Sequence, residues 1–141
     1  MSQEDRLRWD EKHRLAVAGS EAGIRPWLPP WITVRLPSLE LATSASTPRA
    51  LDVACGLGQI ALALTIEHGF QVVGVDVSTV AIEAARVAAE NMGANAEFLQ
   101  ADLDAWQPEA ASFDLIIVHR FLDRLRLPVW IPEALKPGGV P

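Results

Sequence analysis

From Leu51 onward, short apolar runs alternate with helix-like segments, and this alternation restricts the possible fold more than any other feature of the chain. Strands are predicted over residues 51–54, 70–75, 96–100 and 113–118, and helices over 60–68 and from the Ser78 cap to about Met92. The second strand is almost entirely apolar, as expected when both faces of a strand are buried. Such alternation is typical of a parallel sheet flanked by helices. The sequence therefore predicts an α/β fold.

The first 50 residues are less regular. A helix is predicted from the Ser2 cap to about residue 19, with the negative charge of Asp5 in its first turn. Residues 24–50 then contain several prolines, which exclude a long helix there, together with two tryptophans. We predict two regions: residues 1–50, an N-terminal helix with an irregular Pro/Trp-rich segment, and residues 51–141, a binding core.

Composition excludes several classes of protein. The 12 basic and 18 acidic residues give a net charge of -6, which argues against a nucleic-acid groove lined by Lys and Arg. The single cysteine, Cys55, cannot form an internal disulfide. No apolar run approaches the roughly 18 residues that span a bilayer, and the charged start of the chain is unlike a secretory signal. These features predict a soluble, cytoplasmic protein with no membrane partner.

Glycines and polar residues follow the ends of the predicted strands. Gly56 and Gly58 lie in the loop after the first strand, where the absence of a Cβ atom lets a ligand approach the backbone. Asp76, Asp102 and His119 follow the next three strands. Ligands of parallel sheets bind beyond the carboxyl ends of the strands, so this shared placement predicts a binding site.

Each of these residues also has a purely structural interpretation. The glycine loop could be a tight turn, and Asp76 could be a helix-start charge rather than a ligand for ribose hydroxyls. Asp102 could accept a bond from a purine amine or lie in a solvated turn. Asp52, four residues before Gly56, could meet a ligand ammonium group, or, if it is buried, it needs another partner.

The motifs in this order resemble those of the class I, Rossmann-like S-adenosylmethionine-dependent methyltransferases. The resemblance covers about residues 50–139 and rests on Leu51–Gly58, Val73–Ser78, Phe98–Leu103, Phe113–Leu122 and the Leu135–Gly139 turn. Trp9-Asp10 with His13 also resembles the start of some small-molecule members, including tellurite-resistance-type methyltransferases.

The resemblance implies S-adenosylmethionine as the cofactor, methyl transfer to a small-molecule acceptor, and a role for each motif. Asp52, Ala54, Cys55, Gly56 and Gly58 would hold the methionine part, Asp76 the ribose and Asp102 the adenine amine, Val77 and Leu103 would sandwich the adenine, and His119 and Arg120 would line the methyl-donor side. His119 is the one candidate for a general base, but we assign no catalytic residue and no metal ligand.

The chain departs from the family pattern in two ways. Ala54 replaces the commoner glycine, a mild change that should still admit the ligand. The family sheet is doubly wound in the order 3-2-1-4-5-7-6, and this chain ends before the expected fifth strand. We therefore expect an incomplete sheet of strands 1–4, with residues 113–118 as an open edge that a partner chain or a second copy would cover.

Two rival functions remain open at this level. Gly56, Gly58 and Ala61 fit the G-x-G-x-x-G/A pattern of NAD-type oxidoreductases with Asp76 downstream, although Asp102 would have no role there. A half-sheet could also be a catalytically inactive binding module. The acceptor is not readable: Trp27, Trp31, Trp106 and Trp130 could line its pocket, but core packing explains them more simply.

Overall fold

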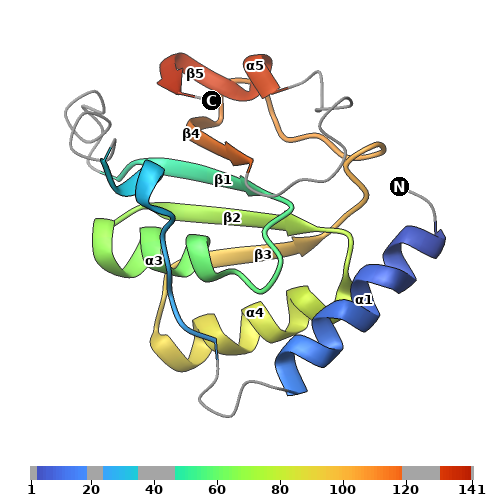
Figure 1. Cartoon of the computed structure of the whole chain (residues 1–141). Coiled ribbons are helices and arrows are strands. Elements are labelled where there is room, and N and C mark those ends of the chain that lie inside the picture. The colour runs from blue at the N-terminus through green and yellow to red at the C-terminus, as the bar shows by residue number, and fades with distance from the viewer. Residues whose placement is uncertain (1–2, 19–23, 35–46, 119–130, 141) are drawn as a thin grey trace.

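A computed structural model describes residues 3–18, 24–34, 47–118 and 131–140 of the chain. The helices are α1 (Gln3–Ala18), α3 (Gln59–His68), α4 (Thr79–Met92) and the short α5 (Ile131–Ala134), with a further helical turn at residues 30–34. The strands are β1 (Arg49–Val53), β2 (Gln71–Asp76), β3 (Ala96–Gln100), β4 (Phe113–Val118) and β5 (Leu135–Val140). They form one sheet in the order β3-β2-β1-β4-β5, and every neighbouring pair is parallel (Figure 1).

The α/β prediction and the strand order 3-2-1-4 are confirmed. The four predicted strands appear within about two residues of their expected bounds. The Ser78 cap is also as expected, because its hydroxyl accepts the Ala81 N–H at 3.2 Å. Gly69 and Gly93 end α3 and α4 in the left-handed conformation.

The expectation of an open edge at strand 113–118 is wrong. β5 lies beside β4, with Phe113 opposite Leu135 and Leu115 opposite Val140. Pro137 and the two glycines after it suggested a turn, but they lie in the irregular stretch between those two register pairs. A proline is tolerated on an edge strand because no ladder bond needs its missing N–H. β4 therefore needs no partner chain to cover it.

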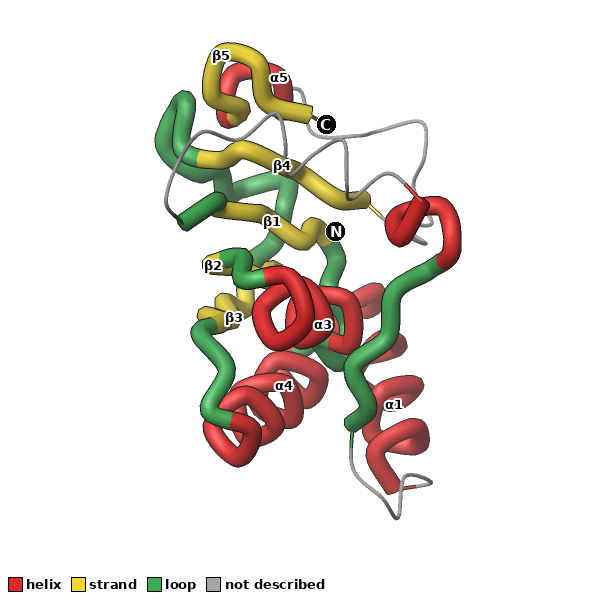
Figure 2. The backbone as a smooth tube through the Cα atoms, turned by 90° about the vertical axis from the view of Figure 1, so that its left-hand side faces the viewer, coloured by secondary structure: helices red, strands yellow, loops and turns green. Residues whose placement is uncertain are grey.

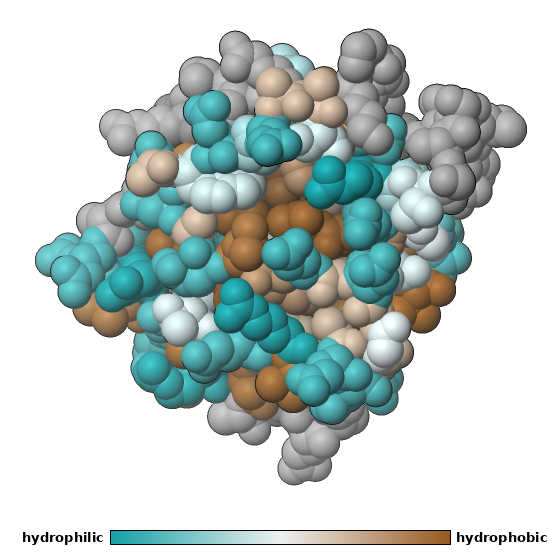
Figure 3. All heavy atoms as spheres, turned by 180° about the vertical axis from the view of Figure 1, so that it is seen from behind, coloured by the Kyte–Doolittle hydropathy of each residue, from teal (hydrophilic) through white to brown (hydrophobic). Residues whose placement is uncertain are grey.

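Two apolar clusters lie on opposite faces of the sheet. On one face, α3 and α4 cover the strands (Figure 2). The cluster on this face includes Ile60, Leu62, Leu64, Ile82, Ala85, Val72, Phe98, Leu115 and Ile117. The other face carries a smaller cluster of Leu51, Val53, Val73, Val75, Leu103, Phe113, Ile116 and Ala134. Seen from behind the view of Figure 1, apolar side chains gather in the middle of the surface and hydrophilic ones surround them (Figure 3).

α1 packs against α4 beside the start of that helix (Figure 1). No helix in the described ranges is long and apolar enough to cross a membrane.

Candidate cofactor site

The carboxyl ends of β1, β2 and β3 meet at one edge of the sheet, because parallel pairing places Val53 beside Val75 and Asp76 beside Gln100. The segments that follow these strands are tied together by the main chain. The Cys55 N–H donates to the Val75 carbonyl at 3.0 Å, and the Ala101 N–H donates to the Asp76 carbonyl at 2.9 Å. The end of β2 is therefore the common anchor of the loops after β1 and β3.

Asp76 is the polar centre of this edge and is only 7% exposed. Its Oδ2 accepts the Gly56 N–H at 2.8 Å, and its Oδ1 accepts the Ser78 N–H at 2.9 Å. A carboxylate offers about four lone-pair positions, and these two bonds use one on each oxygen. Asp76 can thus shape the loop and the start of α4 and still accept hydrogen bonds from a ligand.

The loop after β1 contains residues in the left-handed backbone conformation, which residues other than glycine rarely adopt. Ala54 has φ +58° and Gly58 has φ +81°, both in the left-handed region. The ring of Phe98 on β3 also leaves no space for a side chain at Gly58 or Gly74: an added Cβ would lie 2.8 Å from Phe98 Cζ at the first and 2.7 Å from Phe98 Cδ1 at the second. The glycine loop is therefore a close-packed unit with β2 and β3.

Asp52 lies beneath the loop and is 2% exposed. It accepts a bond from the Ala61 N–H in the first turns of α3, while its Oδ2 has no hydrogen-bond partner among the described residues. Burial, with a further contribution from the negative charge of Asp76, raises the pKa of Asp52 to about 8. At neutral pH the carboxyl is therefore mostly protonated, and its contact with a ligand ammonium stays a prediction.

Cys55 is half-buried beside the same carboxyl groups. Burial raises the pKa of its thiol well above the usual value. Negative charge adds to this effect, first from Asp52 once that carboxyl has ionised above about pH 8, and then from Asp76. A thiol held in the neutral form is a poor nucleophile. Cys55 can line the site, but its surroundings do not suit covalent catalysis.

The loops after β2 and β3 bring an apolar pair to this edge. Val77 and Leu103 are both buried, and the Gln100 side chain ties their loops together by donating to the Val77 carbonyl at 3.0 Å. Asp102 is half-buried and its Oδ1 accepts the Asp104 N–H at 3.0 Å, which is the turn geometry that its structural interpretation expected. His119 and Arg120 lie outside the described residues.

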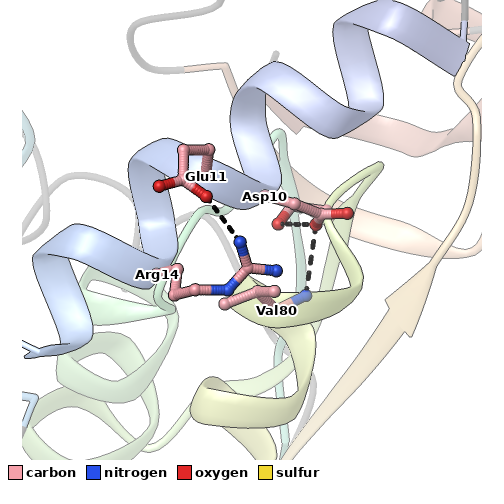
Figure 4. Close-up of polar contacts among 5 residues, drawn as sticks. Asp10, Glu11, Arg14 and Val80 are labelled. Atoms are coloured by element: carbon pink, nitrogen blue, oxygen red, sulfur yellow. Dashed lines mark hydrogen bonds and ion pairs between the residues drawn. The ribbon is translucent and has the colours of Figure 1, made fainter.

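Sequence reasoning missed the contribution of α1 to this edge. Asp10 Oδ1 accepts the Ser78 hydroxyl at 2.5 Å. It also accepts the Val80 N–H at 3.3 Å (Figure 4). His13 lies against Gly56, and burial lowers the pKa of its imidazole while the charge of Asp76 opposes that shift. In the sequence, the Trp9-Asp10…His13 pattern is only a resemblance, and nothing local in it predicts where the helix docks.

The tryptophans divide between core and surface. Trp106 packs against the smaller apolar cluster, so core packing is confirmed there. Trp27 and Trp31 are both nearly half exposed, and Trp130 lies outside the described residues.

The chain is similar to a known protein family and to characterised relatives. The family described as the methyltransferase domain matches residues 50–139. A ubiquinone biosynthesis O-methyltransferase of Coxiella burnetii is 32% identical over 110 residues, which cover 75% of this chain and 47% of the relative. A ribosomal protein L11 methyltransferase of Dechloromonas aromatica is 36% identical over 90 residues, or 63% of this chain and 29% of the relative.

A solved structure agrees with these relatives. Phosphoethanolamine N-methyltransferase 2 of Haemonchus contortus, in complex with phosphomonomethylethanolamine and S-adenosylhomocysteine, is 28% identical with a TM-score of 0.61. The alignment covers 76% of this chain and 27% of that one. The chain spans about half the length of the Coxiella burnetii relative, 47%. Since the family match includes the loop, Asp76, Asp102 and the strands that carry them, this chain belongs to the methyltransferase domain family.

Proposed function

We propose that this chain binds S-adenosylmethionine at the carboxyl ends of β1, β2 and β3, and that the protein transfers a methyl group to a small-molecule acceptor. The observation that carries this proposal is the bond of Asp76 Oδ2 to the Gly56 N–H at 2.8 Å, which joins the glycine loop to an acid with acceptor capacity remaining. The similar Haemonchus contortus N-methyltransferase, whose structure is a complex with S-adenosylhomocysteine, supports it.

The residues at this edge suit the parts of such a cofactor. Asp76 has acceptor positions for ribose hydroxyls, and the buried pair Val77 and Leu103 offers apolar contact for an adenine ring. The N–H of Ala101 donates a hydrogen bond to the Asp76 carbonyl, which places the next residue, Asp102, at the same edge. The Asp102 carboxylate can accept a hydrogen bond from the adenine amine. The loop from Ala54 to Gly58 would hold the methionine part.

When bound, this cofactor supplies a methyl group that its sulfonium already activates. The protein then mainly orients the two reactants and excludes water. The described residues include no group that we assign as a general base, and Cys55 stays a neutral thiol.

The class of acceptor is part of the proposal. The two named relatives act, by their names, in ubiquinone biosynthesis and on a ribosomal protein, so acceptors differ widely within the family. We favour a small molecule because the net charge of -6 does not suit a nucleic-acid surface. Transfer of labelled methyl groups into the small-molecule fraction of a cell extract supports this choice, and labelling of macromolecules alone refutes it.

Calorimetric titration of the full chain with S-adenosylhomocysteine, and separately with NADH, tests the cofactor. We expect binding of the first and none of the second. Asp76→Asn keeps an oxygen that can accept one backbone N–H but removes the charge and the second acceptor, so affinity should fall at least about tenfold. Asp104→Asn, an exposed acid in the next loop, is the matched control and should bind as the unmodified chain does. The proposal is refuted if the folded chain does not bind S-adenosylhomocysteine, or if it binds NADH more tightly.

A further inference from the structure

α1 has its polar side turned toward the protein. Leu7 and Leu15 are 55% and 65% exposed, whereas Asp10 and His13 on the same helix are half-buried. Surface helices ordinarily bury an apolar stripe and expose the charged one. Residues three apart share one face of a helix, so Asp10 and His13 point the same way. Polar contacts, more than apolar burial, therefore set where this helix lies.

Asp10 connects α1 to the start of α4 by hydrogen bonds. Its Oδ1 accepts the Ser78 hydroxyl and the Val80 N–H, as Figure 4 shows for Val80. Ser78 in turn donates its own N–H to Asp76 Oδ1 at 2.9 Å. A continuous chain of hydrogen bonds thus runs from Asp10 through Ser78 to Asp76. By contrast, Arg14 one turn further along pairs only with Glu11 in the described contacts, on the exposed side of the helix (Figure 4).

His13 reaches the glycine loop. Its Cε1 lies 3.4 Å from the point where a Cβ of Gly56 would be, so the imidazole rests on the open face of this glycine. The same Gly56 donates its N–H to Asp76. Trp9 stacks against His13 with ring centroids 5.8 Å apart and limits how far the imidazole can turn.

We propose that His13 is a further cofactor-binding residue, which forms a hydrogen bond with a ribose hydroxyl of S-adenosylmethionine beside Gly56, and that Asp10 is the residue that positions it. This inference rests on the proposed function. A neutral imidazole carries one donor and one acceptor, and a hydroxyl can satisfy either. Asp76 at the end of the sheet and His13 on α1 would then both form hydrogen bonds with the ribose, from two sides.

The direct test is calorimetry of the full chain with S-adenosylhomocysteine and with adenosine. His13→Ala should weaken both ligands by a similar factor of about three to ten, because the contact is to the ribose that they share. His13→Gln keeps a donor and an acceptor and should recover part of the loss. Arg14→Ala, on the exposed side of the same helix, should bind as the unmodified chain does.

The positioning role of Asp10 has its own test. Asp10→Asn keeps an oxygen that can accept from Ser78 and Val80 and should bind nearly normally, whereas Asp10→Ala should lose affinity. If Asp10 acts through His13, the double variant with both alanines should lose no more than His13→Ala alone. Circular dichroism and thermal melting show that each variant is folded.

The outcomes separate the two proposals. If the unmodified chain binds S-adenosylhomocysteine and His13→Ala binds it with the same affinity as Arg14→Ala, the role of His13 is refuted and the proposed function stands. A loss seen with S-adenosylhomocysteine but not with adenosine refutes the ribose contact. Additive losses in the double variant refute the positioning role of Asp10. Absence of binding by the unmodified chain refutes both the function and this inference.

Discussion

Replacing Asp52 by asparagine should change how the stability of the protein depends on pH. Burial raises the pKa of this carboxyl from 3.8 to about 8 in the folded protein. Between these values the folded state holds a proton that the unfolded chain has released. The free energy of unfolding therefore falls as pH rises through this window, and the loss is complete above about pH 8.

The magnitude follows from the two pKa values. At about 1.36 kcal/mol for each pH unit, the difference between 3.8 and about 8 amounts to about 5 to 6 kcal/mol over the whole window. In the Asp52→Asn variant the side chain keeps its shape but does not titrate, and its amide oxygen can still accept the Ala61 N–H. The difference in free energy of unfolding, Asp52→Asn minus the unmodified chain, should therefore increase by about 3 kcal/mol as pH rises from about 5 to about 7.5.

Urea denaturation of both proteins across this pH range, at constant ionic strength, measures the difference. Other titrating groups are present in both proteins, so their contributions largely cancel. Asp104→Asn controls for the loss of one acid at an exposed position. If the difference between Asp52→Asn and the unmodified chain stays constant with pH, Asp52 ionises freely in the folded state and the reasoning from its burial is wrong.

Two further predictions concern the loop after β1. Ala54 holds φ +58°, which costs an alanine about 1 to 2 kcal/mol, so Ala54→Gly should stabilise the protein by about 1 kcal/mol after the greater flexibility of the unfolded glycine is counted. Its Tm should rise by about 3 °C, and a lower Tm would contradict the assignment of strain. Gly58→Ala should destabilise by about 2 to 4 kcal/mol in urea, because the new Cβ meets Phe98 at 2.8 Å and φ is +81°. Combining it with Phe98→Leu should remove part of that loss, and strictly additive losses would show that the ring is not the obstacle.

The parts of the fold that local sequence determines could be predicted from the sequence. The strands 96–100 and 113–118 carry their own apolar runs, and the Ser78 cap is a local signal, so all three appear where they were expected. β5 could not be predicted, because its pairing with β4 depends on another segment of the chain and outweighs the turn tendency of Pro137 and the residues after it.

The candidate site also has parts that could be predicted from the sequence and parts that could not. That Gly56, Asp76 and Asp102 follow strands that end at one edge is a consequence of parallel topology, and the structure places Asp76 in contact with Gly56. The burial of Asp52 and the docking of His13 depend on which helix covers which loop. No spacing within a single segment encodes that arrangement, so the sequence could only leave the surroundings of Asp52 open.

The ring of Phe98 fills the space that Gly58 and Gly74 leave empty, and this has a consequence for engineering. The loop, the second strand and the third strand interlock through one aromatic residue, so none of them is an independent part. Transplanting the glycine loop alone into another parallel sheet would leave either a void or a collision in the recipient. A successful graft should carry all three segments together, with the aromatic residue and both glycines kept as a set.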